Sequence, residues 1–307
     1  MNAQAEETMT TKEQTAPVFD TRRCSLTDGP GVRTTFFFKG CNLRCAWCHN
    51  PESQQSARRR LYYQSRCTGC GVCLQKCPAG ALGRAADGTI LYDEARCTLC
   101  GRCGQFCPQE AISLCGEEKT VEELMQIARR DIAYYGEEGG VTASGGECLL
   151  YPDFMAALFA ACRRENIGTA ADTAGNVPWA AFERVLPVTD LFLYDIKCVS
   201  PALCRQYIGA DGALILENYR RLKSAGARVT VRIPVIPELH LENGEPSAEF
   251  LKMAQFLREA PPEAIELLPY HRLGEHKYAA LGLDEPPSFR VPTEEEMAAL
   301  RQCADGV

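Results

Sequence analysis

The sequence lacks three features, and each absence argues against one class of protein. It has no excess of positive charge, because 40 Asp and Glu outnumber 33 Lys and Arg and give a formal net charge of -7. A nucleic-acid interface needs basic side chains to displace the counterions of the phosphates, so we expect no nucleic-acid partner. No stretch approaches 18 uninterrupted apolar residues, so we expect no membrane-spanning helix and no membrane partner.

The first sixteen residues also lack the apolar segment and the cleavage site of a secretory signal. They are polar and acidic, and we expect residues 1–16 to form a disordered tail. The absence of an export signal predicts a cytoplasmic protein in a reducing environment. Cysteines in such a protein are expected to be thiols or thiolates, not disulfides.

Cysteine, by contrast, is abundant, with 18 in the chain. Eleven of them lie between Cys41 and Cys107 in three groups of regular spacing, and two of these groups are copies of each other thirty residues apart. Each copy has the pattern C-x2-C-x2-C-x3-C-P, which indicates an internal duplication. The first copy contains Cys67, Cys70, Cys73 and Cys77, and the second contains Cys97, Cys100, Cys103 and Cys107.

This duplicated pattern is the run found in bacterial ferredoxins, where three thiolates of one copy hold a [4Fe–4S] cluster and the fourth reaches the other cluster. A pair of zinc sites is the alternative, but zinc modules usually pair two C-x2-C knuckles and have no use for the x3-C-P step. We therefore expect two clusters. By the ferredoxin rule, Cys67, Cys70, Cys73 and Cys107 hold one, and Cys97, Cys100, Cys103 and Cys77 hold the other.

The third group, formed by Cys41, Cys45 and Cys48, offers only three thiolates in C-x3-C-x2-C spacing. A cuboidal cluster has four irons, so three protein ligands leave one iron open to a small molecule. Catalytic metal sites keep an open coordination position of this kind. The sequence therefore predicts a third [4Fe–4S] cluster with a catalytic role.

Outside the cysteine-rich segment, short apolar runs alternate with amphipathic helical patterns, which is typical of βα units and a parallel sheet. Thr120 and Glu123 form a capping box ahead of an apolar stripe, and Ser200 followed by Pro201 is expected to begin another helix. The predicted strands cover residues 32–38, 140–144, 168–172, 191–196, 228–233 and 264–268.

Six strands joined by right-handed crossovers predict an α/β fold, a partial (β/α)6 barrel that is three-quarters closed. The duplicated cysteines lie in the first strand-to-helix connection, so they are expected to form an inserted ferredoxin-like α+β domain. The expected boundaries are a tail at 1–16, the barrel at 17–62 and 117–307, and the two-cluster insert at 63–116. Functional sites of such barrels lie at the carboxyl ends of the strands.

The C-x3-C-x2-C group is the motif of the radical S-adenosylmethionine (SAM) enzymes, and the match continues on both sides of it. The segments Asp28-Gly-Pro-Gly-Val-Arg33, Phe38-Lys-Gly-Cys41 and Trp47-Cys-His-Asn-Pro-Glu52 resemble the glycyl radical enzyme activating enzymes, in the branch that carries a two-cluster ferredoxin insert. The resemblance covers nearly the whole chain after the tail. It implies reductive cleavage of SAM to a 5′-deoxyadenosyl radical, which abstracts a glycine Cα hydrogen from a partner glycyl radical enzyme.

Four later motifs follow in the family's order, each at the end of a predicted strand. From the residues alone, the Glu147 carboxylate suits the substrate ammonium, and Asp195 and Lys197 project from one strand face. The resemblance implies contacts to the SAM amino group, a monovalent cation near the SAM carboxylate, the adenosyl group and the peptide substrate. The residues to which these SAM-site roles pass are Trp47, Cys48, His49, Gly145, Gly146, Glu147, Asp172, Thr173, Asp195, Ile196, Lys197, Arg232 and His271, with Cys41, Cys45, Cys48 and Lys197 as the catalytic set.

One position departs from the family's pattern, because Cys148 follows Gly-Gly-Glu where Pro is common. We expect a buried thiol there, with a redox-sensitive residue as the alternative. The other cysteines show no ligand spacing and are expected to be free thiols. They are Cys24, Cys115, Cys162, Cys198, Cys204 and Cys303.

Two other functions compete with the activating enzyme. A radical SAM enzyme that oxidises a peptide or a small molecule could carry auxiliary clusters, but these usually lie in a C-terminal extension, and only Cys303 follows His271 here. A ferredoxin-type electron carrier would not need the SAM motifs. We expect a monomer whose insert clusters relay electrons from reduced flavodoxin or ferredoxin, with a purely structural role as the alternative.

Overall fold

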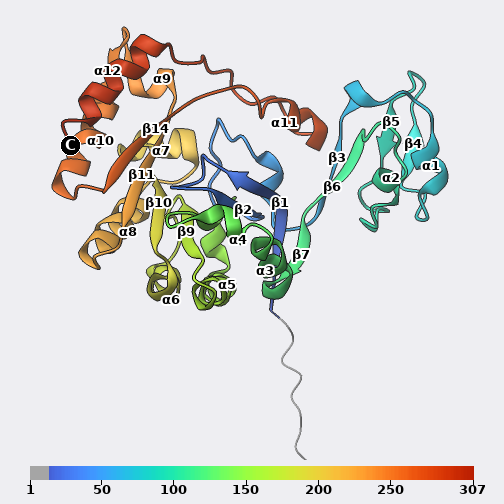
Figure 1. Cartoon of the computed structure of the whole chain (residues 1–307). Helices are drawn as coiled ribbons and strands as arrows, with labels where there is room; N and C mark the ends of the chain where they lie inside the picture. Colours follow the sequence, from blue (N-terminus) through green and yellow to red (C-terminus); the bar gives the residue numbers. More distant parts are fainter. Residues whose placement is uncertain (1–13) are drawn as a thin grey trace, which may run out of the picture.

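The computed structural model describes residues 14–307, and its largest element is a sheet of eight strands. In chain order these strands are β1 (Thr15–Ser25), β2 (Arg33–Phe38), β7 (Glu117–Thr120), β8 (Gly140–Gly145), β9 (Gly168–Thr173), β10 (Leu191–Asp195), β11 (Val229–Val235) and β14 (Ala264–Pro269). They are arranged β14-β11-β10-β9-β8-β2-β1-β7 (Figure 1). Residues 1–13 of the expected tail lie outside the described residues, whereas Thr15 and Ala16 already belong to β1.

The six predicted strands correspond to β2, β8, β9, β10, β11 and β14, and each pairs in parallel with its neighbour. Within the described chain the sheet ends at β14 and does not close back on β2. This confirms the predicted fold class, a partial barrel in an α/β protein. The two antiparallel strands β1 and β7 extend the sheet beyond β2 and were not predicted.

Helices pack on the outer face of the sheet, and their apolar stripes form the main core with it. The predicted capping box is present at α3, where Glu123 N donates to Thr120 Oγ1 and Thr120 N donates to Glu123 Oε2. In the helix between β8 and β9, the ring of Phe154 packs edge-on against that of Phe38, with the ring centroids 5.8 Å apart. The longer helices are α3 (Val121–Arg129), α5 (Pro152–Arg164), α6 (Trp179–Val185), α7 (Pro201–Ile208), α8 (Ala213–Ser224), α10 (Ala248–Glu259) and α12 (Glu294–Ala304), and the shorter ones are α4 (Ile132–Tyr135) and α9 (Pro237–His240).

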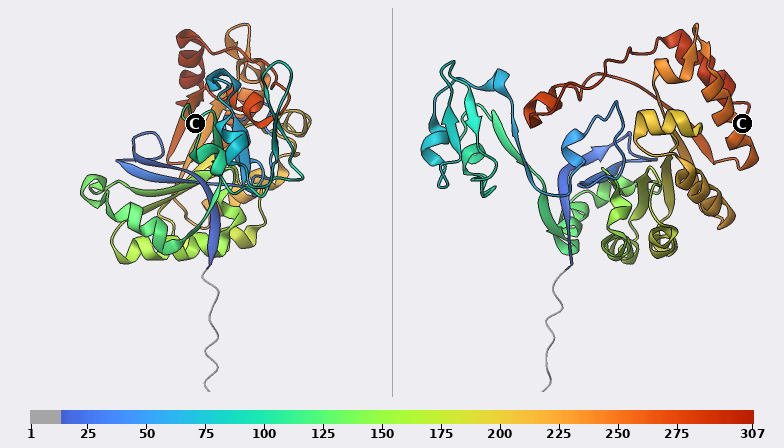
Figure 2. Two further views of the ribbon diagram at one scale, coloured as in Figure 1. Left: turned by 90° about the vertical axis from the view of Figure 1, so that its right-hand side faces the viewer. Right: turned by 180° about the vertical axis from the view of Figure 1, so that it is seen from behind.

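The cysteine-rich insert forms a separate lobe beside the barrel (Figure 2). Two antiparallel strand pairs and two short helices make up this lobe, and α11 (His276–Leu281) from the barrel side packs against its first strand. The pairs are β3 (Arg59–Tyr62) with β6 (Ile112–Cys115) and β4 (Leu82–Arg84) with β5 (Ile90–Tyr92), and the helices are α1 (Val72–Lys76) and α2 (Arg102–Gln105). A further small strand pair, β12 (Leu241–Glu242) with β13 (Glu245–Pro246), lies between α9 and α10.

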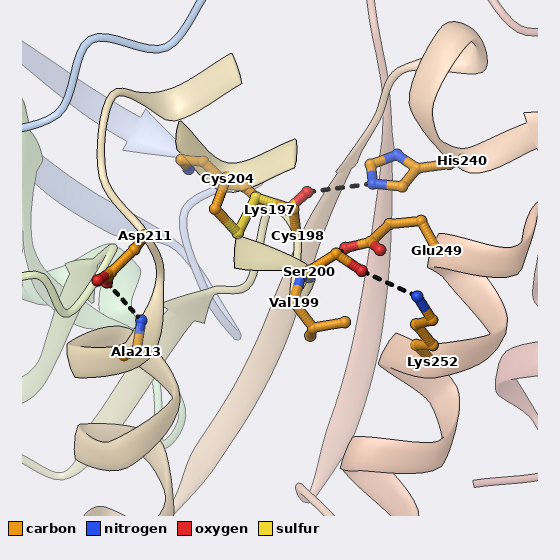
Figure 3. The surroundings of a disulfide bond; sticks show 10 residues. All are labelled: Lys197, Cys198, Val199, Ser200, Cys204, Asp211, Ala213, His240, Glu249 and Lys252. Carbon is orange, nitrogen blue, oxygen red and sulfur yellow. Dashed lines mark hydrogen bonds between the residues drawn. A yellow bond between two sulfur atoms is a disulfide. The ribbon is translucent and has the colours of Figure 1, made fainter. Parts of the chain in front are cut away.

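One sequence expectation about the cysteines was wrong, because Cys198 and Cys204 form a disulfide (Figure 3). The chain turns back from the end of β10 into α7, which brings their Cα atoms to 5.7 Å, within the range that a disulfide spans. Nothing in a spacing of six residues indicates this turn. The cysteines without ligand spacing that remain unpaired, as expected, are Cys24, Cys115, Cys162 and Cys303.

In residues 14–307, no helix has both the length and the hydrophobicity that crossing a membrane requires.

Candidate active site

A cavity of about 520 Å³ lies at the carboxyl ends of the parallel strands. Its volume falls within the usual range for small-molecule sites. All three cysteines of the C-x3-C-x2-C group reach it, together with most of the side chains expected from the later motifs. The predicted residues on its wall are Cys41, Cys45, Trp47, Cys48, His49, Gly145, Gly146, Asp172, Thr173, Asp195, Lys197, Arg232 and His271.

Backbone hydrogen bonds hold the three-cysteine loop between elements that are distant in sequence. Arg44 N donates to Ile208 O at 2.9 Å and Ala46 N donates to Tyr207 O at 2.8 Å, both at the end of α7. On the other side of the loop, the Tyr278 hydroxyl donates to Cys48 O at 3.0 Å. The loop is thus fixed before any ligand binds, which suits a site that must hold its thiolates in a set arrangement.

The glycines at the end of β8, Gly145 in the strand and Gly146 directly after it, are required by the close packing of two strand ends. A Cβ on Gly146 would lie 2.2 Å from Gly40 O, and one on Gly145 would lie 2.3 Å from Phe38 N and O. Gly146 N donates to Phe38 O at 2.8 Å. The glycines therefore bring the end of β8 against the residues that lead into Cys41, and they keep the cavity wall free of side chains there.

Glu147 and Ile196 do not line the cavity. The Glu147 carboxylate accepts hydrogen bonds from Thr173 Oγ1 at 2.7 Å, Leu149 N at 3.1 Å and Ala174 N at 3.1 Å. Burial raises the pKa of Glu147 to about 7, even though these hydrogen bonds lower it. The carboxylate thus braces the end of β9, and its contact with the SAM ammonium stays a prediction. Ile196 follows directly after β10 and is fully buried in the main core, whereas Asp195 and Lys197 on either side of it face the cavity.

Four charged side chains form the inner wall of the cavity. Lys197 Nζ makes an ion pair with Asp195 Oδ2, so the two residues share one face as predicted. Asp172 Oδ2 accepts a hydrogen bond from Ser144 Oγ at 2.6 Å and lies 3.5 Å from Arg232 Nη1. Burial raises the pKa of Asp172 to about 6, Arg232 opposes this rise, and the Asp195 carboxylate adds to it. Two carboxylates on the wall of one cavity suit a cation or a cationic ligand group.

Side chains from α9 and α10 hold the backbone of the segment that carries Lys197 (Figure 3). Burial lowers the pKa of His240 to about 4, so its imidazole is neutral at physiological pH. His240 Nδ1 accepts from Ile236 N at 3.0 Å, which leaves Nε2 as the N–H that donates to Lys197 O at 3.1 Å. Glu249 Oε1 accepts from the backbone N–H groups of Val199 and Ser200, which follow Lys197.

The Asp28-Gly-Pro-Gly-Val-Arg33 loop contributes to the site. In the sequence this segment carried part of the family resemblance, but no site role was predicted for its residues. Thr27 and Asp28 line the cavity from its floor, and the Asp28 carboxylate accepts from Thr35 Oγ1 at 2.9 Å. The Arg33 guanidinium fixes the loop by donating to Pro30 O at 3.1 Å and to Thr142 Oγ1 at 2.7 Å. The motif itself was the sequence signal for these residues.

Helix α11 supplies further residues that no sequence pattern indicated. Lys277 Nζ donates to Asn50 Oδ1 at 2.9 Å and to Glu52 Oε1 at 2.6 Å, directly after the cysteine loop. Nearby, the rings of His49 and His271 stack with their centroids 4.0 Å apart. The residues after β14 thus close over one side of the cavity.

In the insert, the structure brings together the same two sets of cysteines that the ferredoxin rule predicted. One small cavity is lined by the first set and another by the second, each with four thiol groups, the donor set of a [4Fe–4S] cluster. The first contains Cys67, Cys70, Cys73 and Cys107, and the second contains Cys77, Cys97, Cys100 and Cys103. Among residues 14–307, no three Cys, His, Asp or Glu side chains meet at one metal position. The thiolates of a cluster each bind a different iron, so they need not share one centre.

The three cysteines of the main cavity also fit an iron–sulfur cluster. Burial raises the pKa of Cys41 to about 11 and that of Cys45 to about 12. Thiolates in such a buried site need positive charge beside them, which cluster irons supply and which Lys197 adds to. Cys148 is fully buried behind this site, where its thiol contacts Asp172 O at 3.4 Å, so the expectation of a buried thiol is confirmed.

Comparison with known proteins agrees with this geometry. Residues 96–251 match the Radical SAM superfamily, and residues 66–112 match the 4Fe-4S dicluster domain. The chain is 40% identical over 288 residues to the trans-4-hydroxy-L-proline dehydratase activating enzyme of Clostridioides difficile, a match that covers 93% of this chain and 94% of the relative. The chain belongs to the glycyl radical enzyme activating enzymes.

A second relative of this activating enzyme is the (2S)-3-sulfopropanediol dehydratase activating enzyme of Klebsiella oxytoca, 39% identical over 87% of this chain and 85% of the relative. Among solved structures, Streptococcus suis SuiB bound to precursor peptide SuiA shares the fold, with a TM-score of 0.50 at 10% identity over 87% of this chain and 42% of that one. The family assignment confirms the activity class predicted from the motifs. It also removes the simple electron carrier from consideration.

Proposed function

We propose that this activating enzyme carries three [4Fe–4S] clusters and binds SAM in the main cavity. One observation supports the proposal above all: a single cavity holds all three cysteines of the C-x3-C-x2-C group together with the paired charges of Asp195 and Lys197. When bound, the reduced cluster and SAM supply a 5′-deoxyadenosyl radical, the species that removes a hydrogen atom from carbon.

The cavity wall offers complementary groups for each polar part of SAM. Backbone at Gly145 and Gly146, where no side chain intervenes, suits the amino group, and Asp172 and Asp195 suit a monovalent cation beside the SAM carboxylate. The stacked pair of His49 and His271 offers flat surfaces for the adenosyl group. These residues orient the ligand, and the fixed cysteine loop keeps the reacting atoms at a set place.

Lys197 is the residue that we assign to the incoming protein substrate. It lies at the end of β10 on the cavity side, and its backbone is held by His240. Its ammonium can donate to a peptide carbonyl while it remains paired with Asp195, because an ammonium has three N–H donors. The sheet does not close back on β2, so a glycine loop would enter from the side of the cavity that the residues after β14 leave uncovered.

The partner is proposed to be a glycyl radical enzyme, since the two relatives described above serve two different dehydratases. We further propose that reduced flavodoxin or ferredoxin delivers electrons through the insert, and that the enzyme acts as a cytoplasmic monomer. The insert was expected at residues 63–116, and the pairing of β3 with β6 extends it to Arg59. The barrel domain, expected at residues 17–62 and 117–307, then comprises residues 15–58 and 117–307, because β1 begins at Thr15 and β3 belongs to the insert.

The test is anaerobic incubation of the reconstituted enzyme with SAM, a reductant and each of several glycyl radical enzymes, including a trans-4-hydroxy-L-proline dehydratase and a (2S)-3-sulfopropanediol dehydratase. We expect 5′-deoxyadenosine in every reaction and the doublet of a glycyl radical in electron paramagnetic resonance (EPR) spectra with the matching partner. A peptide or small molecule that is consumed in step with SAM, with no glycyl radical from any partner, would support the competing function.

A further inference from the structure

The two halves of the insert differ at several equivalent positions, among them a pair whose side chains line the two cysteine cavities. The duplication extends upstream of the cysteines, because Leu61-Tyr62 and Leu91-Tyr92 also stand thirty residues apart. Immediately before these pairs, the first copy has Arg60 in β3 and the second has Ile90 in β5. The same position in the repeat is therefore cationic in one copy and aliphatic in the other.

These two side chains face different cysteine cavities. Arg60 lines the cavity formed by Cys77, Cys97, Cys100 and Cys103, whereas Ile90 lines the one formed by Cys67, Cys70, Cys73 and Cys107. Within the part of the chain that the structure describes, no positively charged residue lines the second of these cavities. Ile90 is buried, with 4% of its surface exposed, so the contrast lies inside the lobe and not at its surface.

The guanidinium of Arg60 is held in place but has donors without partners. Its Cζ lies 4.1 Å from the centre of the Tyr92 ring and 5.4 Å from that of Tyr62. Its Nε and Nη1 atoms are buried and make no hydrogen bond to any residue in the described range 14–307. Buried charged donors are costly to leave unpaired, so this geometry indicates an acceptor in the cavity that Arg60 faces.

We propose that Arg60 donates hydrogen bonds to the cluster held by Cys77, Cys97, Cys100 and Cys103, and thereby gives it a higher reduction potential than the other insert cluster. The proposal rests on the two clusters assigned to the insert above. Reduction adds negative charge, which a nearby cation and N–H donors to sulfur stabilise. Among the described residues, the lining of the cavity that contains Ile90 includes no cation that would act in this way.

The position of this cluster indicates what the difference in reduction potential would do to the path of an electron. A hollow between the insert and α11 is lined by Arg60, Cys97 and Ala280, so the Arg60 cavity lies on the side of the lobe that faces the barrel. In turn, Tyr278 of α11 contacts Cys48 in the main cavity. An electron that enters the lobe would therefore settle on the cluster that lies on the side of α11.

The test is a redox titration followed by EPR, performed on the full chain with Cys41, Cys45 and Cys48 replaced by Ala so that only the insert clusters remain. Iron analysis first establishes about eight irons per chain, as two clusters require. Arg60→Ile makes the position identical to its twin in the second copy. Arg84→Met is the matched control, because Arg84 lies near the other cysteine loop but is exposed and donates to Gly69 O at 2.6 Å.

In the parent protein we expect two potentials, and Arg60→Ile should lower only the higher one. The shift should correspond to about a tenfold change in the reduction equilibrium, which is about 59 mV for one electron. Arg84→Met should change either potential much less.

Unchanged potentials in Arg60→Ile at full iron content would overturn the proposal. If Arg60→Ile loses iron, Arg60→Lys decides: a smaller fall in the same potential supports the proposal, and no fall refutes it. An iron count well below eight in the parent would instead contradict the cluster assignment itself.

Discussion

Replacing Lys197 by Ala separates the binding of SAM from the activation of a partner. The Lys197 side chain is 11% exposed and its partner Asp195 is 22% exposed, so the pair is largely shielded from solvent. Hydrogen bonds that involve a charged group contribute about 1.5–3 kcal/mol each. If one such bond from Lys197 holds the glycine loop, its loss should lower the efficiency of activation about tenfold to a hundredfold.

Three quantities should be measured on the same preparation of the Lys197→Ala variant: the affinity for SAM, the formation of 5′-deoxyadenosine without a partner, and the yield of glycyl radical with one. We expect the radical yield to fall much more than the other two. Iron content checks that the cluster site is intact, since Lys197 also lies close enough to Cys45 to lower the pKa of that thiol.

Lys252→Ala is the matched control for this experiment. Lys252 lies on α10 in the same region, where its Nζ donates to Ser200 Oγ at 3.2 Å, but it is exposed and outside the cavity (Figure 3). This variant should leave all three quantities unchanged. Equal losses of SAM affinity and partner activation in Lys197→Ala would refute the peptide contact and assign Lys197 to SAM or to Asp195 alone.

Further predictions concern the clusters and the support of the active site. The reconstituted protein should hold about twelve irons, and Cys45→Ala should remove about four of them together with all SAM cleavage. If this variant loses iron but still cleaves SAM, the assignment of Cys45 as a ligand of the SAM-site cluster is wrong. Cys70→Ala or Cys100→Ala should preserve part of the cleavage driven by dithionite, and its complete loss with an intact SAM-site spectrum would contradict a relay role. Burial lowers the pKa of His240 to about 4, so protonation of this imidazole favours the unfolded chain. As the pH falls from 6.5 to 4, the free energy of unfolding of the wild type should therefore decrease by about 3 kcal/mol relative to that of His240→Gln. Parallel pH curves in chemical unfolding would exclude this effect.

Five of the six parallel strands, all except β14, are almost wholly buried, so each stands out in the sequence as a short run of mostly apolar and small residues. Strands β1 and β7 were missed for the opposite reason. Only Ala16 and Val18 of β1 join the main core, and Arg22 and Arg23 interrupt any apolar pattern. The edge strand β7 has the sequence Glu-Glu-Lys-Thr, and charged residues of this kind protect sheet edges from further pairing.

The site shows the same division between local and long-range information. The cysteine sets and the strand-end motifs are short patterns with a chemical meaning, so they could be found without a structure. Lys277 and Tyr278 approach the cysteine loop from more than 220 residues away, and no spacing links them to it. Two further features also depend on tertiary folding. They are the direction of the Glu147 carboxylate, which accepts a hydrogen bond from Thr173 instead of lining the cavity, and the disulfide of Cys198 with Cys204.

The most direct test of the central claim is to follow the hydrogen atom itself. A partner glycyl radical enzyme is prepared with deuterium at the Cα of its glycines and incubated anaerobically with the reduced activating enzyme and SAM. We predict that 5′-deoxyadenosine acquires one deuterium for each glycyl radical counted by EPR. A glycyl radical accompanied only by unlabelled 5′-deoxyadenosine, or labelled product without any glycyl radical, would contradict direct abstraction of the glycine hydrogen by this enzyme.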